Sequence, residues 1–189
     1  MKSVLKQPIN RAVFKVLLVE DNLAEAELIQ EMLGEAEKVR LPLTHVQHVS
    51  EAIEALNQED FDAILLDLSL ADSTGLDTIA RVQECVGQRH TCAYPPIVVL
   101  TGYDDEDFAL QLIRTGVQDC LVKGKVDSKL LICSLRYAIE RQKTQEALRR
   151  REGERGKGGE GERGQGGERE KGREGERGGI TQISSQDYQ

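Results

Sequence analysis

Apolar and polar positions alternate between two patterns from residue 15 to about residue 150. Short apolar runs, typical of strands buried in a parallel sheet, predict strands at 15–19, 43–46, 63–67, 96–101 and 119–123. Apolar residues at helical spacing predict helices at 23–35, 50–58, 75–84, 105–116 and from about 128 onward. Strand and helix alternate five times, which predicts a mostly parallel sheet with helices on both faces.

Several predicted helix ends carry residues that favour an end at that point. Ser50 is placed to cap the N-terminus of the helix at 50–58, and Asp127 or Ser128 is placed to cap the last helix. Such side chains accept hydrogen bonds from the unpaired N–H groups of the first helical turn. Gly116 follows the helix that begins near residue 105 and predicts its C-terminal cap.

The composition changes abruptly between Arg151 and Gly179. This segment contains only Arg, Glu, Gly, Lys and one Gln, and repeats the sequence EGERG at 152–156, 160–164 and 174–178. It has no apolar side chain to bury, so we expect it to be disordered. An RNA-binding tail is disfavoured, because eight Glu cancel the charge of six Arg and two Lys and no aromatic residue is present for stacking on bases.

The overall composition excludes several classes of protein. The 189 residues are 39% hydrophobic and 4% aromatic, which suits an aliphatic α/β core. The net charge of −8 argues against nucleic-acid binding through a broad basic surface. The chain has no apolar run long enough for a transmembrane helix, and its first residues lack the apolar segment of a signal peptide. We therefore expect a cytoplasmic chain without membrane or nucleic-acid partners.

The cysteines and histidines do not match a familiar metal site. The four cysteines, Cys85, Cys92, Cys120 and Cys133, form no CxxC pair, so we expect reduced thiols. His45, His48 and His90, with Cys92, fit no common zinc spacing, and we expect His45 and His48 to be ordinary surface residues.

Polar residues at the ends of the predicted strands carry the candidate chemistry. Glu20 and Asp21 follow the first strand, Asp67 ends the third, Thr101 ends the fourth and Lys123 ends the fifth. Ligand chemistry gathers at the carboxyl ends of such strands. Each residue alone is more often a turn or cap former, but all of them together are hard to explain that way.

Three carboxylates at one corner would repel one another, and a hard divalent cation such as Mg²⁺ resolves that conflict. A carboxylate that the metal does not fully use can attack phosphorus and form an aspartyl phosphate. Asp67 closes a buried strand, and a carboxylate in such a place must be paired, coordinated or neutralised. Lys123 and the Thr101 hydroxyl are suited to contact the phosphoryl oxygens.

Four segments resemble the response-regulator receiver domains of two-component phosphorelay systems: VLLVEDN (16–22), ILLDLSLADSTGLD (64–77), VVLTGYDD (98–105) and GVQDCLVKG (116–124). The resemblance implies a flavodoxin-like, doubly wound five-stranded parallel sheet of order 2-1-3-4-5 with five helices. It implies that Asp67 receives a phosphoryl group from a histidine kinase or phosphotransfer protein. It also implies Mg²⁺ on Glu20, Asp21, Asp67 and the Ser69 carbonyl, and a switch role for Thr101 and Lys123.

Three positions depart from the usual receiver pattern. Cys120 replaces a frequent aromatic residue, which places the usual coupling to the threonine in question; Tyr103 is a candidate substitute. Gly124 stands where the lysine is usually followed by a cis proline, and we expect a trans bond there because cis costs about 3 kcal/mol without proline. Ala71 stands where proline is common. None of these changes touches the phosphotransfer chemistry itself.

The resemblance divides the chain into an N-terminal extension (1–13), a receiver domain (14–140), a helical extension (141–151) and a disordered tail (152–189). The apolar positions of the last helix, including Leu131, Leu135 and Leu148, continue past the end of the receiver. This extension is either a contact that forms a homodimer or a charged helix end that frays. The helix resembles those that join receivers to further signalling modules. Two interpretations of the chain therefore remain: a regulator without a DNA-binding output domain, or a fragment of a hybrid kinase or cyclase.

Two other functions compete with the phosphoacceptor reading. A haloacid-dehalogenase-like phosphohydrolase also uses a strand-end Asp and Mg²⁺, but it needs a second Asp where this chain has Ser69. A flavodoxin-like cofactor binder needs a phosphate loop after the first strand, where Glu20 and Asp21 would repel phosphate. We therefore predict a signalling protein that is not an enzyme beyond its own phosphorylation and dephosphorylation.

Overall fold

The computed structural model describes residues 11–88 and 94–157. Predictions for His90, Cys92 and residues 158–189 lie outside this range. Within it, no helix is both long and apolar enough to cross a membrane.

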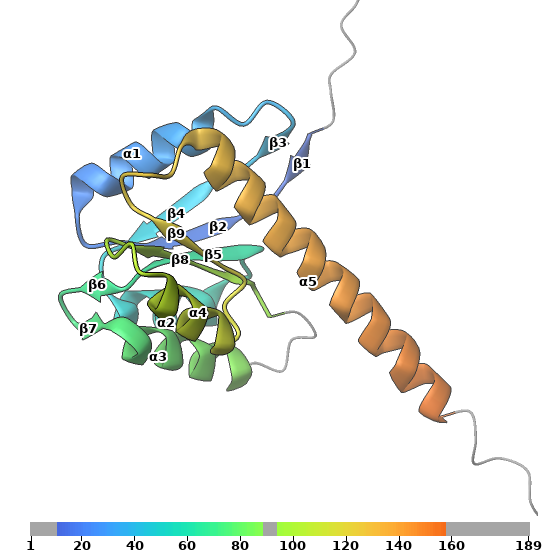
Figure 1. Ribbon diagram of the computed structural model, residues 1–189. Coiled ribbons are helices and arrows are strands. Elements are labelled where there is room, and N and C mark those ends of the chain that lie inside the picture. The colour runs from blue at the N-terminus through green and yellow to red at the C-terminus, as the bar shows by residue number, and fades with distance from the viewer. Residues whose placement is uncertain (1–10, 89–93, 158–189) are drawn as a thin grey trace, which may run out of the picture.

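A parallel five-stranded sheet forms the centre of the fold (Figure 1). Its strands lie in the order β4 (Leu43–Val46), β2 (Val16–Val19), β5 (Ala63–Asp67), β8 (Ile97–Thr101) and β9 (Asp119–Val122). This confirms the predicted order 2-1-3-4-5. The central strands β2, β5 and β8 are buried along their whole length, which explains why they appear in the sequence as unbroken apolar runs.

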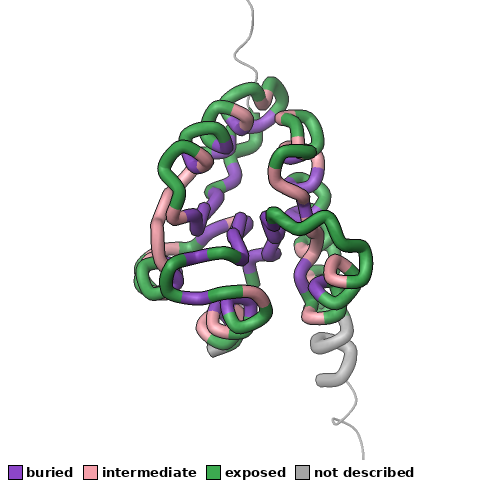
Figure 2. Tube along the Cα trace, turned by 60° about the vertical axis from the view of Figure 1, so that its left-hand side comes forward, coloured by how far each residue is buried: buried purple, intermediate pink, exposed green. Residues whose placement is uncertain are grey.

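Helices cover both faces of the sheet. On one face lie α1 (Leu23–Gly34) and α5 (Ser128–Lys157); on the other lie α2 (Val49–Gln58), α3 (Gly75–Gln88) and α4 (Glu106–Arg114) (Figure 1). Alternate strand residues serve the two faces: Leu18 and Leu65 pack with α1 and α5, whereas Leu17 and Leu66 pack with the other three helices. Figure 2 shows the resulting buried strands between more exposed helices.

Two short strand pairs were not foreseen from the sequence. β1 (Ala12–Val13) pairs in parallel with β3 (Val39–Arg40), and β6 (Ser69–Leu70) pairs antiparallel with β7 (Ser73–Thr74). Two-residue strands carry no detectable alternation of apolar and polar positions, so their pairing depends on tertiary contacts. The β6–β7 hairpin begins two residues after Asp67 and shapes the chain next to it.

One predicted helix cap is wrong, and two others are confirmed. Ser50 does not cap α2: the helix begins at Val49, and the Glu51 carboxylate accepts from the Gln47 N–H at 2.8 Å and the His48 N–H at 3.3 Å. Asp127 caps α5 by accepting from the Leu130 N–H at 2.7 Å. Gly116 follows α4 with φ +97°, a left-handed conformation that favours glycine.

The last helix is longer than the sequence analysis predicted. Its buried apolar positions end with Ile139, and Leu148 in the extension is 54% exposed. The helix then continues to Lys157, past the predicted start of the tail at residue 152. The homodimer contact through this helix stays a prediction.

Candidate functional site

The predicted site residues lie at one edge of the sheet, where the parallel strands end. Asp67 is the last residue of β5, and Thr101 is the last of β8. Glu20 directly follows β2 and Lys123 directly follows β9. Since β2, β5, β8 and β9 are successive neighbours in the sheet, their carboxyl ends form one continuous edge.

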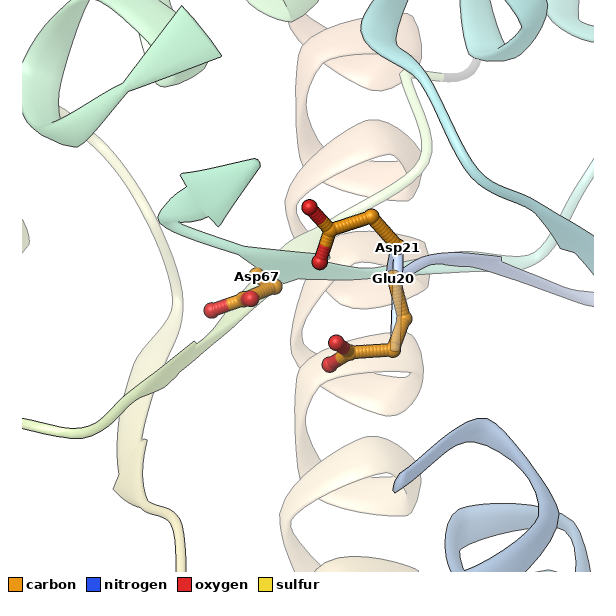
Figure 3. A group of neighbouring side chains, drawn as sticks. All are labelled: Glu20, Asp21 and Asp67. Carbon is orange, nitrogen blue, oxygen red and sulfur yellow. The ribbon is translucent and has the colours of Figure 1, made fainter. Parts of the chain in front are cut away.

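Three carboxylates form the acidic part of the site. One oxygen each of Glu20, Asp21 and Asp67 lies within 4.8 Å of the others, and Figure 3 shows the side chains at the neighbouring ends of β2 and β5. Glu20 is 1% exposed and Asp67 is 2% exposed. The Glu20 N–H donates a hydrogen bond to the Val46 carbonyl at 3.0 Å, so the edge strand β4 fixes the backbone where Glu20 and Asp21 begin.

Lys123 supplies the positive charge of the site. Its ammonium group lies 2.7 Å from Glu20 Oε2 and 3.0 Å from Asp67 Oδ2, and it also contacts the Glu25 carboxylate. Burial by itself would lower the pKa of Lys123, but its hydrogen bonds to these three carboxylates outweigh burial and raise the pKa above its ordinary value. Lys123 is therefore charged throughout the neutral range.

The pKa of Glu20 is also raised, but for an acid a raised pKa disfavours the charged form. Burial raises the pKa of its carboxyl group, the hydrogen bond from Lys123 works against that rise, and the nearby Asp67 adds to it. Burial and the nearby Asp67 thus disfavour the charged form of Glu20, and additional positive charge would stabilise it.

The two carboxylate oxygens of Asp67 have different surroundings. Oδ2 is paired with Lys123, whereas Oδ1 is buried and accepts no hydrogen bond within the described part of the chain. A buried carboxylate oxygen without a partner is costly. The three acids are hard oxygen donors of the kind that Mg²⁺ prefers, so the residues present fit a divalent cation beside Asp67 Oδ1.

Thr101 and Ser69 lie at or just after the strand ends that form this edge, and the contacts found for them are with the backbone of neighbouring segments. The buried Thr101 hydroxyl accepts from the Tyr103 N–H at 3.1 Å, and the Thr101 carbonyl accepts from the Lys123 N–H at 2.8 Å. Ser69 lies in β6, opposite Thr74. The roles of the Thr101 hydroxyl and the Ser69 carbonyl stay predictions.

Two residues at the site were missed by the sequence analysis. Glu25, in the first turn of α1, contacts Lys123. An acid one helical turn after the Glu20–Asp21 pair was the available signal, because α1 begins at the carboxyl edge of the sheet. His45 is not an ordinary surface residue: its Nε2 lies 2.7 Å from the Glu20 carbonyl oxygen.

The departures from the receiver pattern have clear local structures. Burial raises the pKa of the half-buried Cys120 thiol, and Asp119 adds to the rise. Gly124 adopts φ +79°, and no cis peptide bond occurs within residues 11–88 and 94–157, as we expected for the bond after Lys123. The Tyr103 ring is exposed and meets Phe108 edge to face, with centroids 6.2 Å apart.

Comparison with known proteins agrees with this geometry. The model of the family described as the response regulator receiver domain matches residues 16–134. The chain belongs to this family. Receiver domains are signalling modules of two-component systems that interact with histidine kinases.

The receiver is similar to parts of longer regulators. It is 35% identical over 109 residues to the response regulator protein PilR of Pseudomonas aeruginosa, a match covering 58% of this chain and 22% of PilR. It is 31% identical over 115 residues to the methanogenesis regulatory protein FilR1 of Methanothrix harundinacea, covering 58% of this chain and 24% of FilR1. The chain thus spans less than a quarter of the length that these two relatives have.

Solved structures share the receiver fold. The signal receiver domain of a LuxO repressor protein from Vibrio parahaemolyticus aligns with a TM-score of 0.60 at 25% identity, covering 71% of this chain and 96% of that one. The Mn²⁺-bound form of response regulator Rcp1 aligns with a TM-score of 0.51 at 26% identity, covering 65% and 89%.

Proposed function

We propose that this receiver is a phosphoacceptor, and that Asp67 takes a phosphoryl group from a phosphohistidine on a histidine kinase or phosphotransfer protein. The observation that carries the proposal is the state of Asp67. Its carboxylate is buried, Oδ2 contacts Lys123, and Oδ1 lies beside two further acids without a hydrogen-bond partner among the described residues. A fixed carboxylate with one available oxygen is suited to attack phosphorus.

In the proposed step, an Asp67 oxygen forms a bond to phosphorus while the bond from phosphorus to the donor imidazole nitrogen breaks. The electron pair of that bond stays on the imidazole nitrogen. The ring leaves as a neutral imidazole because the other ring nitrogen of the phosphohistidine carries a proton before transfer. Lys123 already touches Asp67 and donates to a phosphoryl oxygen after transfer. The Thr101 hydroxyl is the second proposed donor, since it accepts from the Tyr103 N–H and keeps its own O–H for donation.

Glu20, Asp21, Asp67 and the Ser69 carbonyl are the groups that would hold Mg²⁺. The closeness of the three carboxylates supports this ligand set, and a related regulator, Rcp1, has been solved with Mn²⁺ bound. When bound, the cation offsets the negative charge that gathers as the phosphoryl group arrives. We expect the phosphorylated domain to signal through protein–protein contacts.

The test is incubation of the full chain with acetyl phosphate and Mg²⁺, followed by intact-protein mass spectrometry. We expect one phosphoryl group per chain that hydroxylamine releases, since hydroxylamine cleaves acyl phosphates. Asp67→Asn should abolish this modification, whereas Asp107→Asn, which changes an exposed acid in the first turn of α4, should leave it intact. A stable modification in Asp67→Asn would contradict the proposal.

A further inference from the structure

Glu25 is an additional partner of the proposed phosphotransfer lysine. It extends from the first turn of α1 and contacts the Lys123 ammonium, which also touches Glu20 at 2.7 Å and Asp67 at 3.0 Å. An ammonium group has three N–H donors. Three carboxylates therefore already surround the ammonium group before any phosphoryl group arrives.

A phosphoryl group on Asp67 changes this balance. When Lys123 turns toward a new phosphoryl oxygen, its ammonium group moves away from at least one of the three carboxylates that now surround it. The side chains of Glu20 and Asp67 are almost fully buried, whereas that of Glu25 is 41% exposed. The Glu25 oxygen that contacts Lys123, Oε2, is itself buried, but the rest of the side chain reaches solvent. Water therefore replaces Lys123 more cheaply at Glu25 than at the two fully buried carboxylates, so Glu25 is the partner that Lys123 gives up at least cost.

Glu25 also has space to move away. It lines a groove of about 300 Å³ between α1 and the segment after β9, together with Leu28, Met32 and Val126. Lys123 forms part of the same lining. The Glu25 carboxylate thus lies at the polar end of an open groove, where it exchanges Lys123 for solvent without disturbing the core.

We propose that Glu25 is a positioning residue that restrains Lys123 in the unphosphorylated receiver and thereby opposes phosphorylation. The inference depends on the proposed phosphoacceptor role of Asp67. Two effects of the Glu25 charge both disfavour the phosphorylated state. The Glu25–Lys123 ion pair weakens when Lys123 turns to the phosphoryl group, and the negative charge of Glu25 repels that group. Removing the charge therefore favours the phosphorylated state.

The test compares Glu25→Gln with Glu27→Gln in the full chain. Glu27 is an exposed acid on the same helix, so its variant makes the same change in net charge away from Lys123. Beryllium fluoride, a stable mimic of a phosphoryl group, is titrated with Mg²⁺ present and followed by fluorine NMR. In parallel, acetyl phosphate is used to measure the phosphorylated fraction, the bond from Asp67 to phosphorus forming as acetate leaves.

We expect Glu25→Gln to bind the mimic about three- to tenfold more tightly than wild type, the order expected for one partly screened charge. Glu27→Gln should stay within about twofold of wild type, because its charge is exposed and screened. A gain in affinity is a readout that a merely structural role would not produce, since damage to the site lowers affinity.

Unchanged or weaker binding in Glu25→Gln would overturn the role of Glu25 while leaving the phosphoacceptor function intact. An equal gain in Glu27→Gln would also overturn it, since the effect would then come from net charge alone. If wild type itself neither binds the mimic nor accepts phosphate from acetyl phosphate, the function of Asp67 fails, and the role of Glu25 fails with it.

Discussion

Asp21→Asn should stabilise the receiver in the absence of divalent cations. Asp21 brings a third carboxylate within 4.8 Å of Glu20 and Asp67. Glu20 and Asp67 are paired with Lys123, but no ion pair to Asp21 is found in the described part of the chain. Replacing Asp21 by its neutral isostere thus removes repulsion without removing an ion pair.

The magnitude follows from the geometry. At 4.8 Å, two carboxylates repel by about 3.5 kcal/mol for an effective dielectric constant of about 20. Asp21 is only half-buried, so solvent screens much of this repulsion, and Lys123 offsets part of the rest. We expect a gain of about 1–2 kcal/mol in the free energy of unfolding, or about 3–8 °C in Tm for a domain of this size.

The assay is urea and thermal unfolding of wild type, Asp21→Asn and the control Glu27→Gln, with EDTA and with Mg²⁺. Glu27→Gln removes one negative charge from the exposed side of α1 and should change stability by less than about 0.5 kcal/mol. Mg²⁺ should stabilise wild type, because a ligand that binds only the folded state shifts the equilibrium toward it. Asp21→Asn should lose most of this Mg²⁺ effect.

Two results would refute the reasoning. If Asp21→Asn is less stable than wild type in EDTA, then repulsion among the three carboxylates does not dominate the energetics of the site. If Mg²⁺ stabilises Asp21→Asn as strongly as wild type, then Asp21 is not a ligand, and the cation binds through the other groups or elsewhere.

Three further predictions concern the core, the backbone and a thiol. Leu135→Ala should cost about 2–5 kcal/mol in chemical denaturation, because the side chain is fully buried, whereas Leu148→Ala should cost little; equal losses would contradict the packing. Gly124→Ala should lower stability by about 1–2 kcal/mol, because φ is +79°, while Gly87→Ala, helical and without close neighbours, should raise it by about 0.5–1 kcal/mol. The raised pKa of Cys120 keeps its thiol protonated at pH 8, so peptide mapping should show slow alkylation by iodoacetamide that accelerates above pH 9; rapid alkylation at pH 7 would contradict the burial.

The sequence was sufficient to predict the central sheet and most of the site. Buried strands such as Ala63–Asp67 and Ile97–Thr101 appear as apolar runs, and their spacing leaves room for one helix between each pair. Because parallel strands end at one edge, the residues after them converge on that edge whatever the details of packing. Glu20, Asp67 and Lys123 meet for this reason.

The start of α2 and the short strand pairs were not predictable in the same way. Ser50 is a good capping residue, yet the Glu51 carboxylate binds the two N–H groups before Val49 and fixes an earlier start. Propensity at one position is a weak signal, and a neighbouring side chain that satisfies the same groups overrides it. The β6–β7 hairpin depends likewise on contacts that only the folded chain provides.

By itself, then, the sequence determined which strands are buried and which side chains end them, since both follow from local pattern and from the direction of parallel strands. Only the tertiary structure decided how the charges are shared. Glu25 reaches Lys123 because α1 packs beside the segment after β9. Lys123 contacts Asp67 Oδ2, while Oδ1 accepts no hydrogen bond from residues 11–88 and 94–157. Such partnerships depend on distances of a few ångströms between elements far apart in the chain, to which no local pattern is sensitive.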